Sequence, residues 1–326
     1  MISTCLLSRH VSLGPLPSLF PSPRTGPVRP SDDRLRRAQG TAHSSGAALR
    51  IARELISQKL SGQEQVARHK LLNSTTADAV AQFRAELPAA DCIATIRLIE
   101  AQGAAAYRSA WRTLPITFPK NDLRRVPDHW LDFGARISPL TGSPRLAANP
   151  PNAILNYLYA LLESEARLAA AALGLDPGLG VLHVDASNRD SLALDLLEPV
   201  RPLVDAYLLD WITRQLLRRE WFFEPRDGNC RLMGIFAKQL SETAPTWARA
   251  IAPVAEWVAQ ALWNSAGKSK KGPILPTRLT QRHRSEGRGN AFVMAKNSLP
   301  RRGKICEVCG AEGVKSRYCG SCAVEA

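Results

Sequence analysis

The sequence is poor in aromatic residues and contains no long apolar run. Aromatic side chains account for 6% of the 326 residues, although hydrophobic residues of all kinds account for 45%. A helix that crosses a bilayer needs ~20 consecutive apolar residues, and no segment approaches that length. The start of the chain also lacks the basic region and uninterrupted apolar stretch of a secretion signal. We therefore expect a globular protein with no membrane association.

Acidic residues are few in proportion to basic ones. The chain has 29 Asp and Glu against 43 Lys and Arg, which gives a formal net charge of +14 at pH 7. Such an excess favours a polyanionic partner, because basic side chains replace the counterions that condense on nucleic acid. A basic surface can also serve solubility alone. The charge therefore indicates nucleic-acid binding without establishing it.

Cysteine is scarce along most of the chain. Four of the seven Cys residues fall in the last 21 positions, which is not the distribution of a disulfide framework and fits a reducing cytoplasm. These four form two Cys-x2-Cys pairs with nine residues between them. Four thiolates complete the tetrahedral shell of a structural zinc ion, and the alternative is two pairs of free or redox-active thiols. The predicted zinc ligands are Cys306, Cys309, Cys319 and Cys322.

Composition divides the chain into four segments. Residues 1–40 are rich in Pro, Ser and Arg without a helical or strand period, so we expect a disordered or remnant segment. Residues 41–265 carry apolar residues at helical spacing and form the predicted α-helical catalytic domain. Residues 266–304 are interpreted as a flexible basic linker, and residues 305–326 as the small zinc module.

A mainly α fold follows from the period of the apolar residues. Gly62 is expected to end or bend the first helix, and Gly174 to stop a later one. The proline-rich stretch 114–150 predicts a long irregular connection, with His129, Trp130 and Phe133 as anchors to the core. The helices are expected from Ala47, after Thr75, and near 90–102, 152–174, 192–217 and 244–262.

Polar residues interrupt this apolar region at four positions. Glu165 lies inside a predicted helix, and His183 follows the turn GLDPGLG. Asp195 and Glu198 are three residues apart, which places both on one face if the segment is helical. Carboxylates with an imidazole suit Mn²⁺ or Mg²⁺, and such an ion can polarise a phosphodiester and orient an attacking hydroxyl. Taken singly, each residue is as consistent with a structural or surface role.

Two stretches in this region carry a family resemblance, ALLESEARLAAAALGLDPGLGVLH and SLALDLLEPVRPLVD. Together they resemble the core of the CRISPR-associated adaptation endonuclease family, and similar flanking text extends the resemblance over roughly residues 40–245. The resemblance implies that Glu165, His183 and Glu198 bind Mg²⁺ or Mn²⁺. It makes Asp195 an additional catalytic acid, leaves Glu163 as a nearby alternative to Glu165, and places Arg201 where it can neutralise a DNA phosphate.

For function, the resemblance implies a metal-dependent DNA endonuclease and integrase. Such a protein joins a free DNA 3′-hydroxyl to a repeat strand by transesterification, and so inserts spacers into a CRISPR array in antiviral defence. The resemblance also implies a homodimer that works with DNA and a small ferredoxin-like companion protein. Members of the family begin with a β-rich domain, for which the segment before Ala47 leaves little room, so we expect that domain to be truncated or missing.

Two other functions remain open at this point. One is a solitary or mobile-element-associated homologue that performs the same chemistry on a different target. The other is a non-catalytic DNA-binding scaffold, although the complete set of candidate ligands argues against the loss of catalysis.

Overall fold

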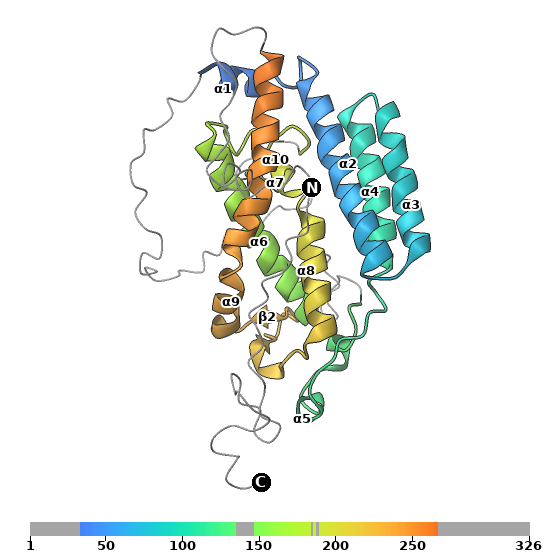
Figure 1. Cartoon of the computed structure of the whole chain (residues 1–326). Helices are drawn as coiled ribbons and strands as arrows, with labels where there is room; N and C mark the ends of the chain where they lie inside the picture. The colour runs from blue at the N-terminus through green and yellow to red at the C-terminus, as the bar shows by residue number, and fades with distance from the viewer. Residues whose placement is uncertain (1–32, 135–146, 184, 187–188, 267–326) are drawn as a thin grey trace, which may run out of the picture.

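The computed structural model describes residues 33–134, 147–183, 185–186 and 189–266, and this part of the chain is predominantly helical (Figure 1). The predicted mainly α fold is confirmed. The only strands in the described part, β1 (Phe222–Phe223) and β2 (Arg231–Leu232), form one antiparallel pair. The helices are α1 (Asp33–Gly40), α2 (Ala47–His69), α3 (Ser74–Glu86), α4 (Ile93–Ser109), α5 (Lys120–Leu123), α6 (Pro150–Ala172), α7 (Ser191–Leu197), α8 (Arg201–Arg214), α9 (Gly234–Ser241) and α10 (Ala244–Ser265). Short 3₁₀ helices are η1 (Leu87–Ala89), η2 (Asp128–Trp130) and η3 (Arg219–Trp221).

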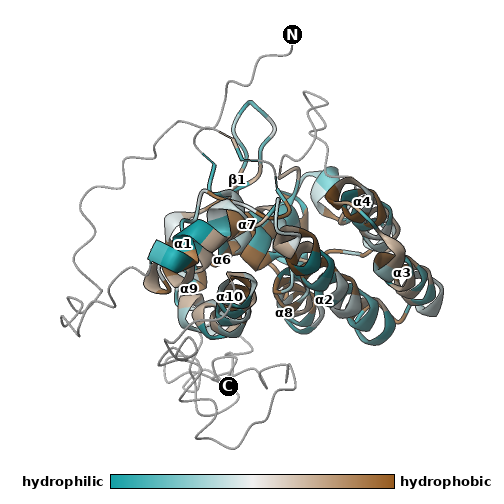
Figure 2. Ribbon diagram, turned by 90° about the horizontal axis from the view of Figure 1, so that it is seen from above, coloured by the Kyte–Doolittle hydropathy of each residue, from teal (hydrophilic) through white to brown (hydrophobic). Residues whose placement is uncertain are grey.

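The helices form two packed groups. In the first, α2, α3 and α4 pack against one another, and in the second α6 packs against α7, α8 and α10. Figure 2 shows the first group lying beside the second when the molecule is seen from above. Helix α2 joins the groups through contacts with α7, α8 and α10. Within the described ranges, no helix is long and apolar enough to span a membrane.

Helix α2 begins where the sequence predicts but does not end at Gly62. It continues to His69, so the expected break is wrong. A Cβ at position 62 would lie 2.8 Å from the Cβ of Pro202. The glycine therefore allows α8 to approach α2 closely, and packing on both sides of the helix outweighs the weak helix propensity of glycine.

One described segment before the predicted domain differs from expectation. Residues 33–40 were expected to be irregular but form α1, where the Arg34 guanidinium lies 4.9 Å from the ring centroid of Trp263 on α10. Residues 1–32, the predicted linker from 267 onward and the predicted zinc module lie outside the described residues. No zinc ligand is therefore placed.

The proline-rich connection is anchored as predicted. Trp130 and Phe133 are both buried in the core, and the His129 Nε2 atom lies 2.9 Å from a Glu224 carboxylate oxygen. The side chain of Asn149 caps the start of α6 and donates to the backbone carbonyl of Phe133. These contacts fix the entry into α6, which is followed by the turn that leads to the candidate site.

Candidate functional site

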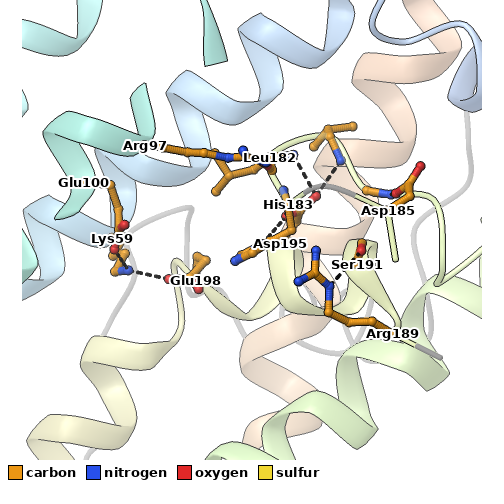
Figure 3. Close-up of polar contacts among 12 residues, drawn as sticks. Lys59, Arg97, Glu100, Leu182, His183, Asp185, Arg189, Ser191, Asp195 and Glu198 are labelled. Atoms are coloured by element: carbon orange, nitrogen blue, oxygen red, sulfur yellow. Dashed lines mark hydrogen bonds and ion pairs between the residues drawn. The ribbon is translucent and has the colours of Figure 1, made fainter. Parts of the chain in front are cut away.

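The turn that follows α6 positions His183. Helix α6 ends at Ala172, and Gly174 adopts a left-handed φ of 82°, which confirms the predicted stop. The chain then reaches His183, whose Nδ1 atom lies 2.6 Å from Oδ1 of Asp195 on α7 (Figure 3). A carboxylate at Nδ1 fixes the ring orientation and favours the tautomer that leaves Nε2 as an acceptor. In the described part of the chain, Nε2 makes no hydrogen bond.

Asp195 is committed to holding this turn. Its side chain is 0% exposed, and its Oδ2 accepts the backbone N–H groups of Val181 and Leu182 at 2.6 and 3.0 Å. Its Oδ1 also accepts the backbone N–H of His183 at 2.9 Å. Both oxygens of Asp195 are therefore occupied by the turn and by the ring of His183, and its role as an additional catalytic acid stays a prediction.

The turn is also held from outside. Arg97 on α4 donates from Nε to the carbonyl of Leu182 at 2.8 Å, and its second nitrogen contacts the same oxygen. Gly180 donates to the side chain of Asp185 at 2.8 Å. A Cβ at position 180 would lie 2.7 Å from the His183 carbonyl oxygen, so the turn requires a residue without a side chain there.

Glu198, immediately after α7, is a buried carboxylate between two cations. It is 3% exposed, with one oxygen 2.6 Å from Lys59 Nζ and the other 3.0 Å from a guanidinium nitrogen of Arg201. Burial by itself raises the pKa of Glu198, but Arg201 and Lys59 outweigh burial and lower the pKa to about 2. The charge of His183 acts in the same direction, which places the imidazole within electrostatic reach of Glu198.

Lys59 connects Glu198 with a second carboxylate, that of Glu100. Lys59 lies on α2 and is 3% exposed, and its ammonium contacts Glu100 on α4 as well as Glu198. Figure 3 shows the three side chains meeting beside the His183 turn. The structure therefore brings His183, Glu198 and Glu100 to one region from three separate parts of the fold.

Glu165 makes no contact with this cluster. It is half-buried on α6, where burial raises its pKa, and it makes no hydrogen bond or ion pair with the described residues. Its neighbour Glu163 pairs with Arg167 at 3.1 Å. The unpaired state of Glu165 favours it over Glu163 as a carboxylate available to a cation, but no contact joins it to His183 or Glu198.

Sequence reasoning missed Lys59 and Glu100. Lys59 occupies the buried face of α2 between Ile56 and Leu60, and a lysine on an apolar face was the available signal. Glu100 lies three residues after Arg97, so the two share a face of α4. Lys59 and Glu100 are 41 residues apart, and Glu198 lies on a third segment, so the sequence does not show that the three side chains meet.

A second buried network adjoins the site through Arg201. Asp205 on α8 accepts the hydroxyl of Tyr107 at 3.0 Å and also the hydroxyl of Tyr159. Burial, together with the charge of Asp205, raises the pKa of Tyr159 to about 12. The Arg201 guanidinium lies 5.2 Å from the ring centroid of Tyr159. Arg201 is therefore held between Glu198 and this network.

The donor chemistry fits a divalent cation, although the ligands are not gathered around one point. Among the described residues, no group of three or more His, Cys, Asp or Glu side chains is arranged to hold a metal ion. His183 nevertheless presents a free Nε2, and Glu198 and Glu100 already share one buried cation, the Lys59 ammonium. Imidazole nitrogen with carboxylate oxygens is a donor set suited to Mn²⁺ and compatible with Mg²⁺.

Comparison with known proteins gives consistent matches. The family model described as CRISPR associated protein Cas1 matches residues 22–243. The chain is 35% identical over 214 residues to CRISPR-associated endonuclease Cas1 2 of Rhodospirillum rubrum, a match covering 61% of this chain and 57% of the relative. It thus spans less than two thirds of that relative's length.

Solved structures show the same fold. A casposase bound to integration product superposes with a TM-score of 0.59 at 24% identity, covering 74% of this chain and 71% of the other. A partial Cas6-RT-Cas1–Cas2 complex superposes with a TM-score of 0.54 at 18% identity, covering 70% of this chain and 68% of the other.

Proposed function

The chain belongs to the Cas1 family of CRISPR-associated proteins, and from this premise we propose that it is a metal-dependent DNA endonuclease and integrase. The reaction is the attack of a free DNA 3′-hydroxyl on a phosphodiester of a target strand. The bond from the target phosphorus to its original 3′-oxygen breaks as the new ester forms, so that a spacer is inserted into a CRISPR array. A member named as an endonuclease supports the cleavage reaction, and a solved relative bound to its integration product supports joining.

The arrangement of His183 carries the proposal. Asp195 holds the imidazole at Nδ1 and at the backbone, while Nε2 makes no hydrogen bond in the described structure. A carboxylate behind a histidine is the arrangement that orients the ring and raises its basicity at metal sites. Beside it, Glu198 has a pKa of about 2 and is therefore ionised at neutral pH. An imidazole nitrogen without a hydrogen bond and an ionised carboxylate are suitable ligands for a cation.

We propose His183 Nε2 and Glu198 as two ligands of Mg²⁺ or Mn²⁺. Such an ion would stabilise charge on the phosphodiester and help orient the attacking hydroxyl. The residues around it have separate tasks: Asp195 fixes the ring of His183, and Arg97 holds the turn that carries it. Arg201 is placed to contact a DNA phosphate, for which it would exchange part of its pairing with Glu198.

The third ligand has two candidates, Glu100 and Glu165. The sequence resemblance selects Glu165, whereas the contacts in the structure favour Glu100, because Glu100 shares the Lys59 ammonium with Glu198. Glu165 has no such contact in the described residues. We therefore propose Glu100 as the third ligand and Glu165 as the alternative.

We also propose DNA, a second copy of the chain and a companion protein as partners. The net charge of +14 favours DNA. One solved relative is part of a complex that contains Cas2, which supports a companion for this chain. A ferredoxin-like fold for that companion and the homodimer are expectations from the family resemblance.

The test is a joining assay with matched carboxylate variants. A labelled duplex with free 3′-hydroxyls and a repeat-containing target are incubated with Mn²⁺ or Mg²⁺, and the strand-transfer product is quantified. His183→Ala and Glu198→Gln should each reduce product roughly a hundredfold or more, since even changes behind a ligand cost 10–100-fold. Glu100→Gln should be equally damaging, whereas Glu165→Gln should remain close to the wild type.

The outcomes separate the assignments. Strong loss in Glu165→Gln with activity retained in Glu100→Gln would return the third ligand to Glu165 and leave the function unchanged. Wild-type product formed in excess chelator would contradict the metal mechanism itself. All variants should retain the wild-type circular dichroism spectrum, so that loss of folding is not mistaken for loss of chemistry.

The likeness to a casposase supports a second candidate function. A mobile-element-associated integrase would use the same residues on a different target. Offering the repeat and unrelated DNA in one reaction discriminates the two, because a CRISPR integrase should select the repeat boundary.

A further inference from the structure

Gln39, near the end of α1, holds the beginning of the turn that carries His183. It is 4% exposed, and its amide nitrogen donates to the backbone carbonyls of Asp176 and Leu179 at 2.7 and 2.9 Å. Its amide oxygen accepts the backbone N–H of Asp176 at 2.9 Å. One side chain therefore satisfies three backbone groups of a turn that begins 137 residues further along the chain.

The amide of glutamine matches all three of these groups. It offers two N–H donors and a carbonyl acceptor, whereas an ionised glutamate of the same shape has no donor. A glutamate at position 39 would therefore direct its carboxylate at two carbonyl oxygens. Because a buried polar group without a partner is costly, the turn depends on the chemistry of this side chain as well as on its shape.

The segment that carries Gln39 is itself anchored to the fold. Helix α1 packs against α10, where the Arg34 guanidinium lies 4.9 Å from the ring centroid of Trp263 (Figure 1). After α1, the Nε2 atom of His43 lies 3.3 Å from the carbonyl oxygen of Gly180, further along the same turn. The segment thus links α10 to the turn at two points.

The beginning of the turn is also where α7 is attached. The carbonyl of Pro177 accepts the backbone N–H groups of Leu192 and Ala193, in the first turn of α7, at 2.8 and 3.3 Å. Helix α7 leads directly to Glu198, and the turn itself leads to His183. The amide on α1 therefore fixes the stretch of backbone that relates these two side chains to each other.

We propose that Gln39 is a positioning residue of the candidate site, which sets the placement of His183 relative to Glu198 before a cation binds. The inference rests on the proposed function, because it takes those two residues as ligands. Gln39 acts through the backbone of residues 176–179 and needs no contact with the cation or with DNA. A turn that has lost this support must be ordered by the ion itself, and that cost weakens binding.

The test compares Mn²⁺ affinity in Gln39→Met and Gln39→Glu with that of the wild type. Methionine keeps an unbranched side chain of similar length without the amide, and glutamate keeps the shape without the donors. Free and bound Mn²⁺ are measured by electron paramagnetic resonance at neutral pH, without DNA, so that the readout is independent of turnover. Both variants should bind Mn²⁺ roughly tenfold more weakly or worse, as when a partner behind a ligand is removed. Wild-type affinity in Gln39→Glu would mean that position 39 only fills space, and would overturn the inference.

Arg219→Met provides the matched control. Arg219 also supports irregular backbone, because its guanidinium donates to the carbonyls of Arg125 and Phe222 at 3.0 and 2.7 Å, but these bonds do not involve the turn or α7. Arg219→Met should lower the Tm and leave the Mn²⁺ affinity at the wild-type value. Weakened Mn²⁺ binding in Arg219→Met to the same degree as in Gln39→Met would show that affinity follows general stability, and the positioning role would be refuted.

Hydrogen exchange in the metal-free protein gives a measurement that does not depend on a variant folding. In the wild type, the Asp176 amide should exchange slowly, because Gln39 accepts its hydrogen bond. In Gln39→Met, that amide should exchange roughly tenfold faster or more, whereas amides in α3 should keep their wild-type rates. A wild-type Asp176 amide that exchanges as fast as an unstructured peptide, or equal Mn²⁺ affinities in the wild type and Gln39→Met, would overturn the inference and leave the proposed function standing. If the wild type binds no Mn²⁺, the metal site of the proposed function fails, and this inference fails with it.

Discussion

Replacing Asp195 by alanine should destabilise the protein strongly, because one buried side chain satisfies four polar groups. Its two oxygens accept the backbone N–H groups of Val181, Leu182 and His183 and the ring of His183. The side chain is 0% exposed, so solvent does not replace these bonds in the intact fold. Asp195→Ala leaves three amides and an imidazole without their acceptor.

The size of the effect follows from the cost of unpaired buried donors. Each one costs roughly 1–3 kcal/mol, and three amides together would cost roughly 3–9 kcal/mol if none recovered. Water entering the space left by the carboxylate offsets part of this. We therefore expect a loss of about 3–5 kcal/mol in the free energy of unfolding, a large share of the ~5–15 kcal/mol typical of a folded domain.

The assay is thermal unfolding followed by circular dichroism. Asp195→Ala should lower the Tm by on the order of 10 °C. Asp78→Ala is the control, because Asp78 makes an exposed ion pair with Arg68 and should melt close to the wild type. Asp195→Asn, which keeps the shape but only one acceptor oxygen, should fall between the two and lose roughly 10–100-fold in joining activity. A Tm for Asp195→Ala equal to that of the control would refute the claim that these bonds hold the turn.

Four other outcomes are expected. Gly180→Ala should lower the Tm, because the new Cβ would meet the His183 carbonyl oxygen and Ser191, whereas Gly40→Ala, which meets nothing within 4 Å, should not; equal melting of the two would contradict the close approach. The unfolding free energy should decline between about pH 10 and 12, because the raised pKa of Tyr159 favours its neutral form in the fold. Tyr159→Phe should show a shallower decline in urea titrations across that range, and identical slopes would count against the assignment. Deleting residues 268–326 should flatten the salt dependence of DNA binding measured by fluorescence anisotropy, because this segment holds the basic linker. The intact chain should carry one zinc ion by elemental analysis, because the same segment holds the four cysteines.

Much of the fold could be predicted because helix signals are local. The period of apolar residues located most of the long helices, but the single helix expected over 192–217 is divided into α7 and α8, and α9 was not predicted. Gly174 ends α6 with the left-handed φ expected of a helix stop. The prediction at Gly62 was wrong because glycine can end a helix or allow a second helix to pack closely against it. Only the position of Pro202 in the structure shows that Gly62 allows close packing. The anchoring of the segment before α6 by Trp130 and Phe133 could be predicted because large apolar side chains are usually buried.

The sequence by itself determined that the chain is a basic, mainly helical protein, and it singled out His183, Asp195 and Glu198 through their setting and family resemblance. Only the tertiary structure decided how these residues differ: Asp195 is occupied in holding the turn, whereas His183 keeps a free nitrogen. It also decided that Lys59 and Glu100 belong beside Glu198. The physical reason is that a buried charge needs partners, and distant helices supply them. The helical period shows which face of a helix is apolar, but it does not show which residues pack against that face.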